Sequence, residues 1–170
     1  MKLYSDEHQQ RYLDYYAKHQ ARERPSPWLE RIDQMAEALQ AKSILDYGCG
    51  DARGLSRYLT RVPVADYDPG VPGLDVPPSP ADLVVSLHAL EHIEPECADV
   101  VIRHMQSLTR KALYIAVSCE PSTKLLPDGT PWHTFVRSPE WWRERLQGFA
   151  ELQPRHDRPG AEFVGMWWPT

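Results

Sequence analysis

The chain of 170 residues is long enough for one domain with one buried core, and its apolar and charged fractions are those of an ordinary globular protein. A net charge of −5, without any block of basic residues, argues against a dedicated binder of duplex nucleic acid. The sequence has no stretch resembling a secretion signal or a membrane span, and its three cysteines have neither metal-knuckle nor redox spacing. We therefore expect a cytoplasmic protein with reduced thiols and no metal site.

Apolar periodicity and turn residues predict helices and strands in alternation. The predicted elements, in chain order, are helices over about 5–21 and 27–40, a strand over 43–47, a helix over 52–60, strands over 62–67 and 81–87, a helix over 95–108, a strand over 112–119, a helix over 140–146 and two strands over 149–156 and 162–168. This alternation is typical of an α/β fold, with a doubly wound, mostly parallel sheet that a closing antiparallel strand pair completes. We expect one domain over 1–170.

A glycine turn follows the first predicted strand in the segment Ile44-Leu45-Asp46-Tyr47-Gly48-Cys49-Gly50. A strand that ends in Gly-x-Gly lets backbone N–H groups come close to a ligand. The dinucleotide-binding fingerprint has a third glycine three residues later, but Arg53 stands at that position. Asp46 would repel a pyrophosphate and would suit a ligand that carries cationic groups. The turn therefore favours a cationic ligand over a dinucleotide.

Asp68 ends the second predicted strand, eighteen residues after Gly50. A carboxylate at the end of the neighbouring strand can accept hydrogen bonds from both hydroxyls of a ribose, and Pro69 beside it can pack on an adenine. Alone, Asp68-Pro69-Gly70 would be read as a simple turn. Together with the glycine turn at this spacing, the ligand-binding interpretation is favoured.

Three stretches together resemble the class I S-adenosylmethionine-dependent methyltransferases: Ile44–Asp51, Ala65–Pro69 and Asp82–Ile93. The last stretch is similar to the motif after the fourth strand in the small-molecule branch of that family. The resemblance covers roughly Ser43 to Cys119 and implies a Rossmann-like methyltransferase fold with S-adenosylmethionine as cofactor. It also implies three regions, which are N-terminal helices over the cofactor site (1–42), a cofactor-binding core (43–119) and a substrate-side loop with C-terminal strands (120–170).

The resemblance assigns cofactor-binding roles to residues at the matching positions. Asp46 and the glycine turn would hold the methionine end, Asp68 would hold the ribose, and tyrosines of the first helix could close over the cofactor. The residues expected to bind the cofactor are Asp46, Tyr47, Gly48, Cys49, Gly50, Asp68, Pro69, Leu87, His88, Tyr12 and Tyr16. The proline-rich stretch 69–80 leaves little room for the third strand that related enzymes have, so we expect that strand to be reduced or missing.

Methyl transfer is an in-line displacement that requires positioning, and it requires a base only if the acceptor loses a proton. His133, in the loop after strand 112–119, is the first candidate for a base, with a hydrogen-bonded loop histidine as the alternative. His88 and Glu91 follow strand 81–87 and are further candidates, but His88 could simply line the cofactor and Glu91 could pair locally. His92 is expected to have a structural role.

The sequence therefore predicts methyl transfer from S-adenosylmethionine to an oxygen or nitrogen of a small-molecule acceptor such as a sugar, a nucleotide or a metabolite. One alternative is a catalytically weak or inactive S-adenosylmethionine-binding module that supports a partner protein. A second alternative is a nicotinamide-dependent oxidoreductase, which Arg53 and Asp46 disfavour. We expect no duplex nucleic acid and no membrane as partners, and the sequence leaves the oligomeric state open.

Overall fold

The structure is a computed structural model of the chain, and it describes residues 3–19, 23–155 and 160–170. Its centre is a six-stranded sheet with the strand order β2-β1-β3-β4-β6-β5. The first four strands in this order run parallel, and β6 and β5 close the sheet as antiparallel neighbours. The strands are β1 (Ile44–Tyr47), β2 (Val64–Tyr67), β3 (Ala81–Leu87), β4 (Thr109–Ser118), β5 (Ala150–Glu151) and β6 (Glu162–Trp167). The predicted α/β fold with a closing antiparallel pair is confirmed.

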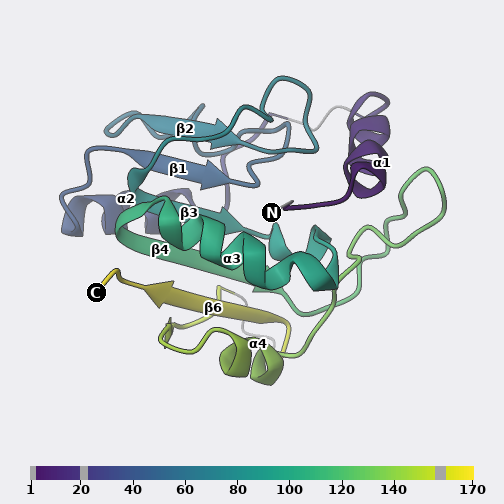
Figure 1. Cartoon of the computed structure of the whole chain (residues 1–170). Coiled ribbons are helices and arrows are strands. Elements are labelled where there is room, and N and C mark those ends of the chain that lie inside the picture. Colours follow the sequence, from purple (N-terminus) through teal and green to yellow (C-terminus); the bar gives the residue numbers. More distant parts are fainter. Residues whose placement is uncertain (1–2, 20–22, 156–159) are drawn as a thin grey trace.

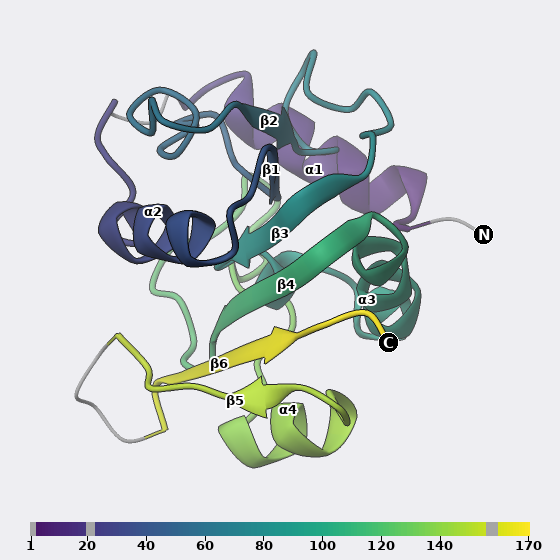
Figure 2. The same cartoon turned by 90° about the vertical axis from the view of Figure 1, so that its left-hand side faces the viewer.

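Helices cover both faces of this sheet, as Figure 2 shows, with α2 on one side and α3 on the other. The helices are α1 (Asp6–Tyr16), α2 (Leu29–Ala38), α3 (Ala98–Ser107), α4 (Pro139–Arg145) and the short 3-10 helices η1 (Leu90–His92) and η2 (Pro95–Cys97). Side-chain caps fix two of the helix starts. The Ser5 hydroxyl accepts from the third amide of α1, and Ser138 does the same for α4, which has a proline in its first turn.

Two hydrophobic clusters hold the layers together, one on each face of the sheet. In β3, which is buried on both faces, Val84 belongs to one cluster while Leu83 and Val85 belong to the other. The first cluster includes Val101, Met105 and Trp142 from α3 and α4, and the second includes Trp28, Ile32 and Ala36 from α2 and the turn before it. The unbroken apolar run of the sequence is therefore explained by a strand with helices on both sides.

The segment expected to be a helix over 52–60 is instead a run of turns. Arg53 adopts a left-handed conformation with φ 46°, which interrupts a right-handed helix at its start. Gly54 packs directly on the backbone of Ser26, where a Cβ would come within 2.9 Å of the amide nitrogen. The turns still bury Leu55 completely, so the segment fills the helix layer without being helical.

Other boundaries also differ from the predicted ones. Within residues 68–80 there is no strand, which confirms that the third strand is missing and leaves β2 at the edge of the sheet. The strand expected over 149–156 is reduced to the two residues of β5, and its last position lies outside the described residues. The first helix ends at Tyr16, earlier than expected, and residues 20–22 are likewise outside the described ranges.

The helix α1 lies beyond the carboxyl ends of β1, β2 and β3, as Figure 1 shows. Ser5 donates from its backbone amide and from its hydroxyl to the Glu94 carboxylate, at 2.7 Å each. Gln9 donates to the Pro69 carbonyl oxygen at 2.8 Å. These bonds fix α1 above the edge where ligands bind in open α/β sheets. Across the described part of the chain, no helix has the length and apolar character needed to cross a membrane.

Candidate functional site

A cavity of about 970 Å³ lies at the carboxyl ends of the parallel strands, and residues of α1 line it. Its walls come from α1, the turn after β1, the turn after β2, the segment after β3 and the loop after β4. Twelve of the residues predicted from the sequence line this one cavity: Tyr12, Tyr16, Tyr47, Gly48, Cys49, Gly50, Asp68, Pro69, Leu87, His88, Glu91 and His133. Asp46 does not line it and lies behind the glycine turn, with 4% of its surface exposed.

The glycine turn is shaped by its contact with the end of β3. Gly48 has φ 83°, and its amide donates to the Tyr67 carbonyl oxygen at 2.7 Å. A Cβ on Gly48 would lie 2.4 Å from the Cβ of Ala89, a separation that real structures do not show. Only glycine allows the backbones after β1 and β3 to approach this closely, and the approach forms the floor of the cavity.

Asp68 joins the turns that follow β1 and β2. Its Oδ2 accepts from the Gly50 amide at 2.8 Å, and its Oδ1 accepts from the Gly70 amide at 2.9 Å. Burial raises the pKa of this carboxyl, while the two N–H donors act in the opposite direction. Each carboxylate oxygen retains a lone pair for a further donor, so Asp68 can accept hydrogen bonds from a ligand in the cavity.

The buried Asp46 carboxyl group behind the glycine turn has a strongly shifted pKa. Burial raises the pKa of Asp46 to about 8, and the nearby Asp66 and Asp68 carboxylates add to the effect. Burial also raises the pKa of the Cys49 thiol, to which the same three carboxyl groups contribute, so this thiol is neutral and unsuited to a nucleophilic role. This end of the cavity would be stabilised by a positive charge.

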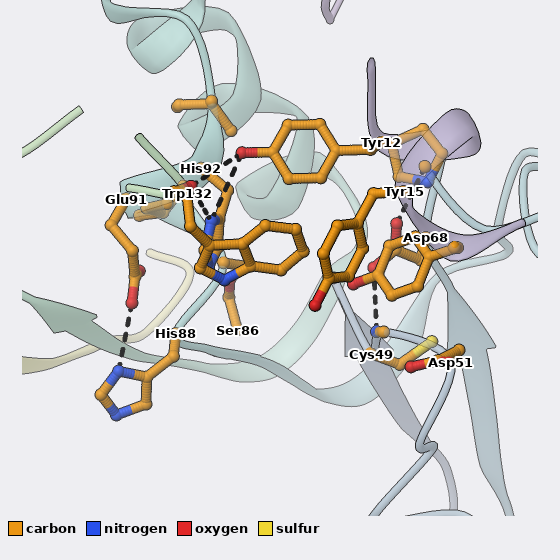
Figure 3. Close-up of a pocket in the computed structure, with 18 of the residues that line it drawn as sticks. Tyr12, Tyr15, Cys49, Asp51, Asp68, Ser86, His88, Glu91, His92 and Trp132 are labelled. Carbon is orange, nitrogen blue, oxygen red and sulfur yellow. Dashed lines mark hydrogen bonds and ion pairs between the residues drawn. The ribbon is translucent and has the colours of Figure 1, made fainter. Parts of the chain in front are cut away.

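The side chains of Tyr12, Tyr15 and Trp132 form an aromatic group in the middle of the cavity. Figure 3 shows this group between Asp68 on one side and His92 on the other. The Trp132 ring lies 4.3 Å from the Tyr15 ring and 5.2 Å from the Tyr12 ring, between centroids. The Tyr12 hydroxyl donates to the Trp132 carbonyl oxygen at 3.0 Å. Sequence reasoning assigned no site role to Trp132 or Tyr15, although Tyr15 shares the helix of Tyr12 and Trp132 adjoins His133.

His88 lies at the end of β3 in a left-handed conformation with φ 56°. Its Nδ1 is 3.1 Å from Oε1 of Glu91, and its Nε2 is 2.9 Å from Oε1 of Glu162. Burial would lower the pKa of His88, but the hydrogen bonds to Glu162 and Glu91 outweigh burial and raise it to about 9. The His88 ring is therefore a cation that lies between two carboxylates, and each of its nitrogens contacts one of them. In Figure 3 it points away from the aromatic group.

Glu91, His92 and His133 meet at the far end of the cavity from Asp68. Each offers one potential ligand atom, and these atoms all lie within 4.8 Å of one another. His92, which sequence reasoning assigned to a structural role, lines the cavity, and burial lowers its pKa so that the ring is neutral. The adjacency of Glu91 and His92 to the end of a predicted strand was the signal that could have found this cluster.

The loop after β4 is bonded to η1, which places His133 in this cluster. The Phe135 amide donates to the Glu91 carbonyl oxygen at 3.0 Å, and the Thr134 hydroxyl donates to the Ile93 carbonyl oxygen at 3.1 Å. The structure thus brings together the three residues proposed as catalytic, because Glu91 contacts His88 on one side and lies close to His133 on the other. The role of each stays a prediction.

Comparison with protein-family models and with curated proteins finds no match to this sequence. Comparison with solved structures finds similar folds. A complex described as DhpI-SAM-HEP is similar with a TM-score of 0.55 and 17% identity, and the match covers 94% of each chain. Magnesium protoporphyrin IX methyltransferase (ChlM) from Synechocystis PCC 6803, with bound SAH, gives a TM-score of 0.57 at 16% identity, over 92% of this chain and 91% of that one.

TehB from Haemophilus influenzae gives a TM-score of 0.54 at 16% identity, over 91% of this chain and 65% of that one. At such identities the likeness concerns the fold and not the substrate. The order of the strands, the antiparallel closing pair and these similarities agree, and the chain has the fold of the class I S-adenosylmethionine-dependent methyltransferases.

Proposed function

We propose that this chain is an S-adenosylmethionine-dependent methyltransferase that methylates an oxygen or nitrogen of a small-molecule acceptor such as a sugar, a nucleotide or a metabolite. The observation that carries the proposal is the meeting of the glycine turn and Asp68 on one cavity, through the bond from the Gly50 amide to Asp68. Two motifs eighteen residues apart thus supply one ligand site. The fold supports the same conclusion.

The residues of the cavity fit this cofactor. The turn at Gly48 leaves no room for a side chain, so the backbone after β1 can come close to the methionine end of the cofactor. Asp68 would accept from the ribose hydroxyls. The Ser86 hydroxyl is fully buried on the cavity lining and has no hydrogen-bond partner among the described residues, so a polar ligand atom would satisfy it. When bound, S-adenosylmethionine supplies an electrophilic methyl carbon.

A small acceptor is supported by the shape and charge of the protein. The cavity volume is in the range of small-molecule sites, and α1 residues and Trp132 line it. The net charge of −5 disfavours duplex nucleic acid as the acceptor. In this proposal His133 orients or deprotonates the acceptor, while His88, with both nitrogens bound, positions Glu91. The three unpaired cysteines support a cytoplasmic location.

One observation favours the alternative of an inactive S-adenosylmethionine-binding module. The strand that flanks the adenine side in related enzymes is missing, and β2 is an edge strand. The oxidoreductase alternative finds less support. A pyrophosphate is bound at the N-terminus of a helix, and the residues after Gly50 form turns instead, with Arg53 at the position of the third glycine.

The test is calorimetric titration of the full chain with S-adenosylmethionine and S-adenosylhomocysteine, with reduced nicotinamide dinucleotide as the control ligand. We expect binding of the first two, a large loss of affinity in Asp68→Ala and no loss in Asp82→Ala. Asp82 is a matched control because it also accepts a backbone amide, that of Lys42 at 2.8 Å, away from the cavity. No binding at millimolar ligand would overturn the proposal.

Turnover separates the enzyme from the inactive module. The native protein is incubated with S-adenosylmethionine and a panel of hydroxyl and amine acceptors, and mass spectrometry detects a methylated product. We expect His133→Ala to retain cofactor binding and to lose turnover. Cofactor binding without a methylated product, across acceptors of both kinds, would support the inactive module instead.

A further inference from the structure

We propose that Glu91, His92 and His133 form a binding site for one divalent first-row transition-metal ion, with Zn²⁺ as the reference ion. This goes beyond the proposed methyl transfer and can be tested without it. The sequence predicted no metal site, because these ligands come from two distant segments and no short motif joins them. Glu91 and His92 belong to η1, whereas His133 belongs to the loop after β4.

The spacing of the three groups suits one ion. One ligand atom of each residue lies within 4.8 Å of the others. A tetrahedral ion about 2.1 Å from each ligand atom would place those atoms about 3.4 Å apart. Binding an ion would therefore require the ligand atoms to move closer together by rotation of their side chains, while the bond from the Phe135 amide to the Glu91 carbonyl oxygen holds the two backbone segments together.

The hydrogen bonds of both histidines leave Nε2 as the ligand atom. His92 Nδ1 lies 2.8 Å from the Trp132 carbonyl oxygen, and His133 Nδ1 lies 2.6 Å from the Glu120 carbonyl oxygen. A carbonyl oxygen can only accept, so each Nδ1 carries a proton and Nε2 is the ring nitrogen left to bind an ion. Metal-binding histidines are commonly held in this way, with one ring nitrogen donating to a carbonyl.

Glu91 supplies the anionic ligand of the set. Its side chain is fully buried, and Oε1 is hydrogen-bonded to His88. The other oxygen, Oε2, is buried without a hydrogen-bond partner among the described residues. A buried carboxylate oxygen without a partner is costly, and an ion bound beside it would remove that cost. His88 and its second carboxylate partner, Glu162, then hold the Glu91 carboxylate in place.

Two imidazole nitrogens and one carboxylate form a ligand set that Zn²⁺, Fe²⁺, Co²⁺ and Mn²⁺ accept while keeping open positions. The three residues line the cavity that also contains the glycine turn, so the open positions are accessible from it. If the proposed methyl transfer is correct, His133 as a ligand would orient the acceptor through the ion and would not deprotonate it, and an acceptor hydroxyl bound at the ion would lose its proton to solvent more readily. Its oxygen then forms the bond to the methyl carbon as the bond from that carbon to sulfur breaks.

The test uses the full chain, freed of metal with a chelator and dialysed. Calorimetric titration with Zn²⁺ should give one site per chain, and Co²⁺ should give the visible absorption of a low-symmetry nitrogen–oxygen site. Loss of one ligand should weaken binding by about a hundredfold or more, which exceeds the effect of an outer-sphere change. We expect this loss in His133→Ala and in Glu91→Gln.

His104→Ala is the matched control, because His104 on α3 bonds the Tyr47 hydroxyl and does not line the cavity. It should bind Zn²⁺ as the native chain does. Glu91 is buried, so its variant is checked by circular dichroism, and the partly exposed His133 keeps the test valid if that variant fails to fold. Absence of a one-to-one site, or equal binding by native protein and His133→Ala, would overturn the proposal. Cofactor titrations with chelator present report separately on the methyltransferase proposal.

Discussion

Asp46 gives the sharpest prediction, which is that binding of the cationic cofactor releases a proton from its carboxyl group. With a pKa of about 8 in the free protein, about 90% of the Asp46 side chains are protonated at pH 7. A cation in the cavity favours the carboxylate form even without direct contact, because Asp46 lies directly behind the glycine turn. The perturbation is the substitution Asp46→Asn, which removes the titrating group and keeps its size.

The expected proton release follows from Coulomb's law. One positive charge about 6 Å from the carboxylate, at an effective dielectric constant of about 20, is worth about 3 kcal/mol. That energy lowers the pKa by about 2 units, from about 8 to about 6. Protonation at pH 7 then falls from about 90% to about 10%, so about 0.8 proton is released for each cofactor bound.

The assay is calorimetric titration at pH 7 in buffers with different ionisation enthalpies, with a chelator present so that metal-linked protons do not contribute. The slope of the observed enthalpy against the buffer enthalpy gives the protons released. Asp46→Asn should bring the slope close to zero and weaken binding. A slope near zero for the native protein, or an unchanged slope in Asp46→Asn, would refute the reasoning.

Three further predictions concern cofactor binding, stability and local dynamics. Gly48→Ala should abolish cofactor binding in a titration, since its methyl would lie 2.4 Å from a neighbouring carbon, whereas Gly73→Ala, also at positive φ but in open space, should lose only about 1 kcal/mol and bind normally. The raised pKa of Asp46 destabilises the fold increasingly as pH rises from about 4 to about 8, so Asp46→Asn should raise the melting temperature more at pH 8 than at pH 5. Ser5→Ala removes the cap of α1 and the bond to Glu94, which should cost about 1–2 kcal/mol locally, and unchanged hydrogen exchange in α1 would contradict this.

The sequence predicted those parts of the fold in which local pattern and tertiary environment agree. The run Ala81–Leu87 is apolar because both faces of β3 are covered, and its predicted and observed bounds coincide. The helix expected over 52–60 was wrong because its pattern is amphipathic while Arg53 takes a left-handed conformation. No propensity scale contains that conformation, which adjoins the close packing of Gly54 on Ser26.

The candidate site likewise contains residues that the sequence predicted and contacts that it could not predict. The glycine turn and Asp68 were predictable because each follows a strand of the parallel set, and the carboxyl ends of such strands meet at one edge. The contact between Trp132 and His92 was not predictable, because it joins residues forty positions apart through a loop without regular structure. The ion pair of His88 with Glu162 could not be predicted either, because it depends on the antiparallel pairing of β6 with β4.

The cavity has two chemically different ends, and this difference allows binding and turnover to be separated experimentally. The end at Asp68 presents the carboxyl group of Asp68, with Asp46 buried behind the glycine turn, and these groups suit a cationic, ribose-bearing ligand. The end at His133 presents ring nitrogens and a buried carboxylate, which suit an acceptor or a metal ion. Asp68→Ala should therefore raise the dissociation constant of the cofactor, whereas His133→Ala should lower kcat at saturating cofactor and leave that constant unchanged. If both variants changed the same constant, the two ends would have to act as one site, and the division of labour argued from their chemistry would be wrong.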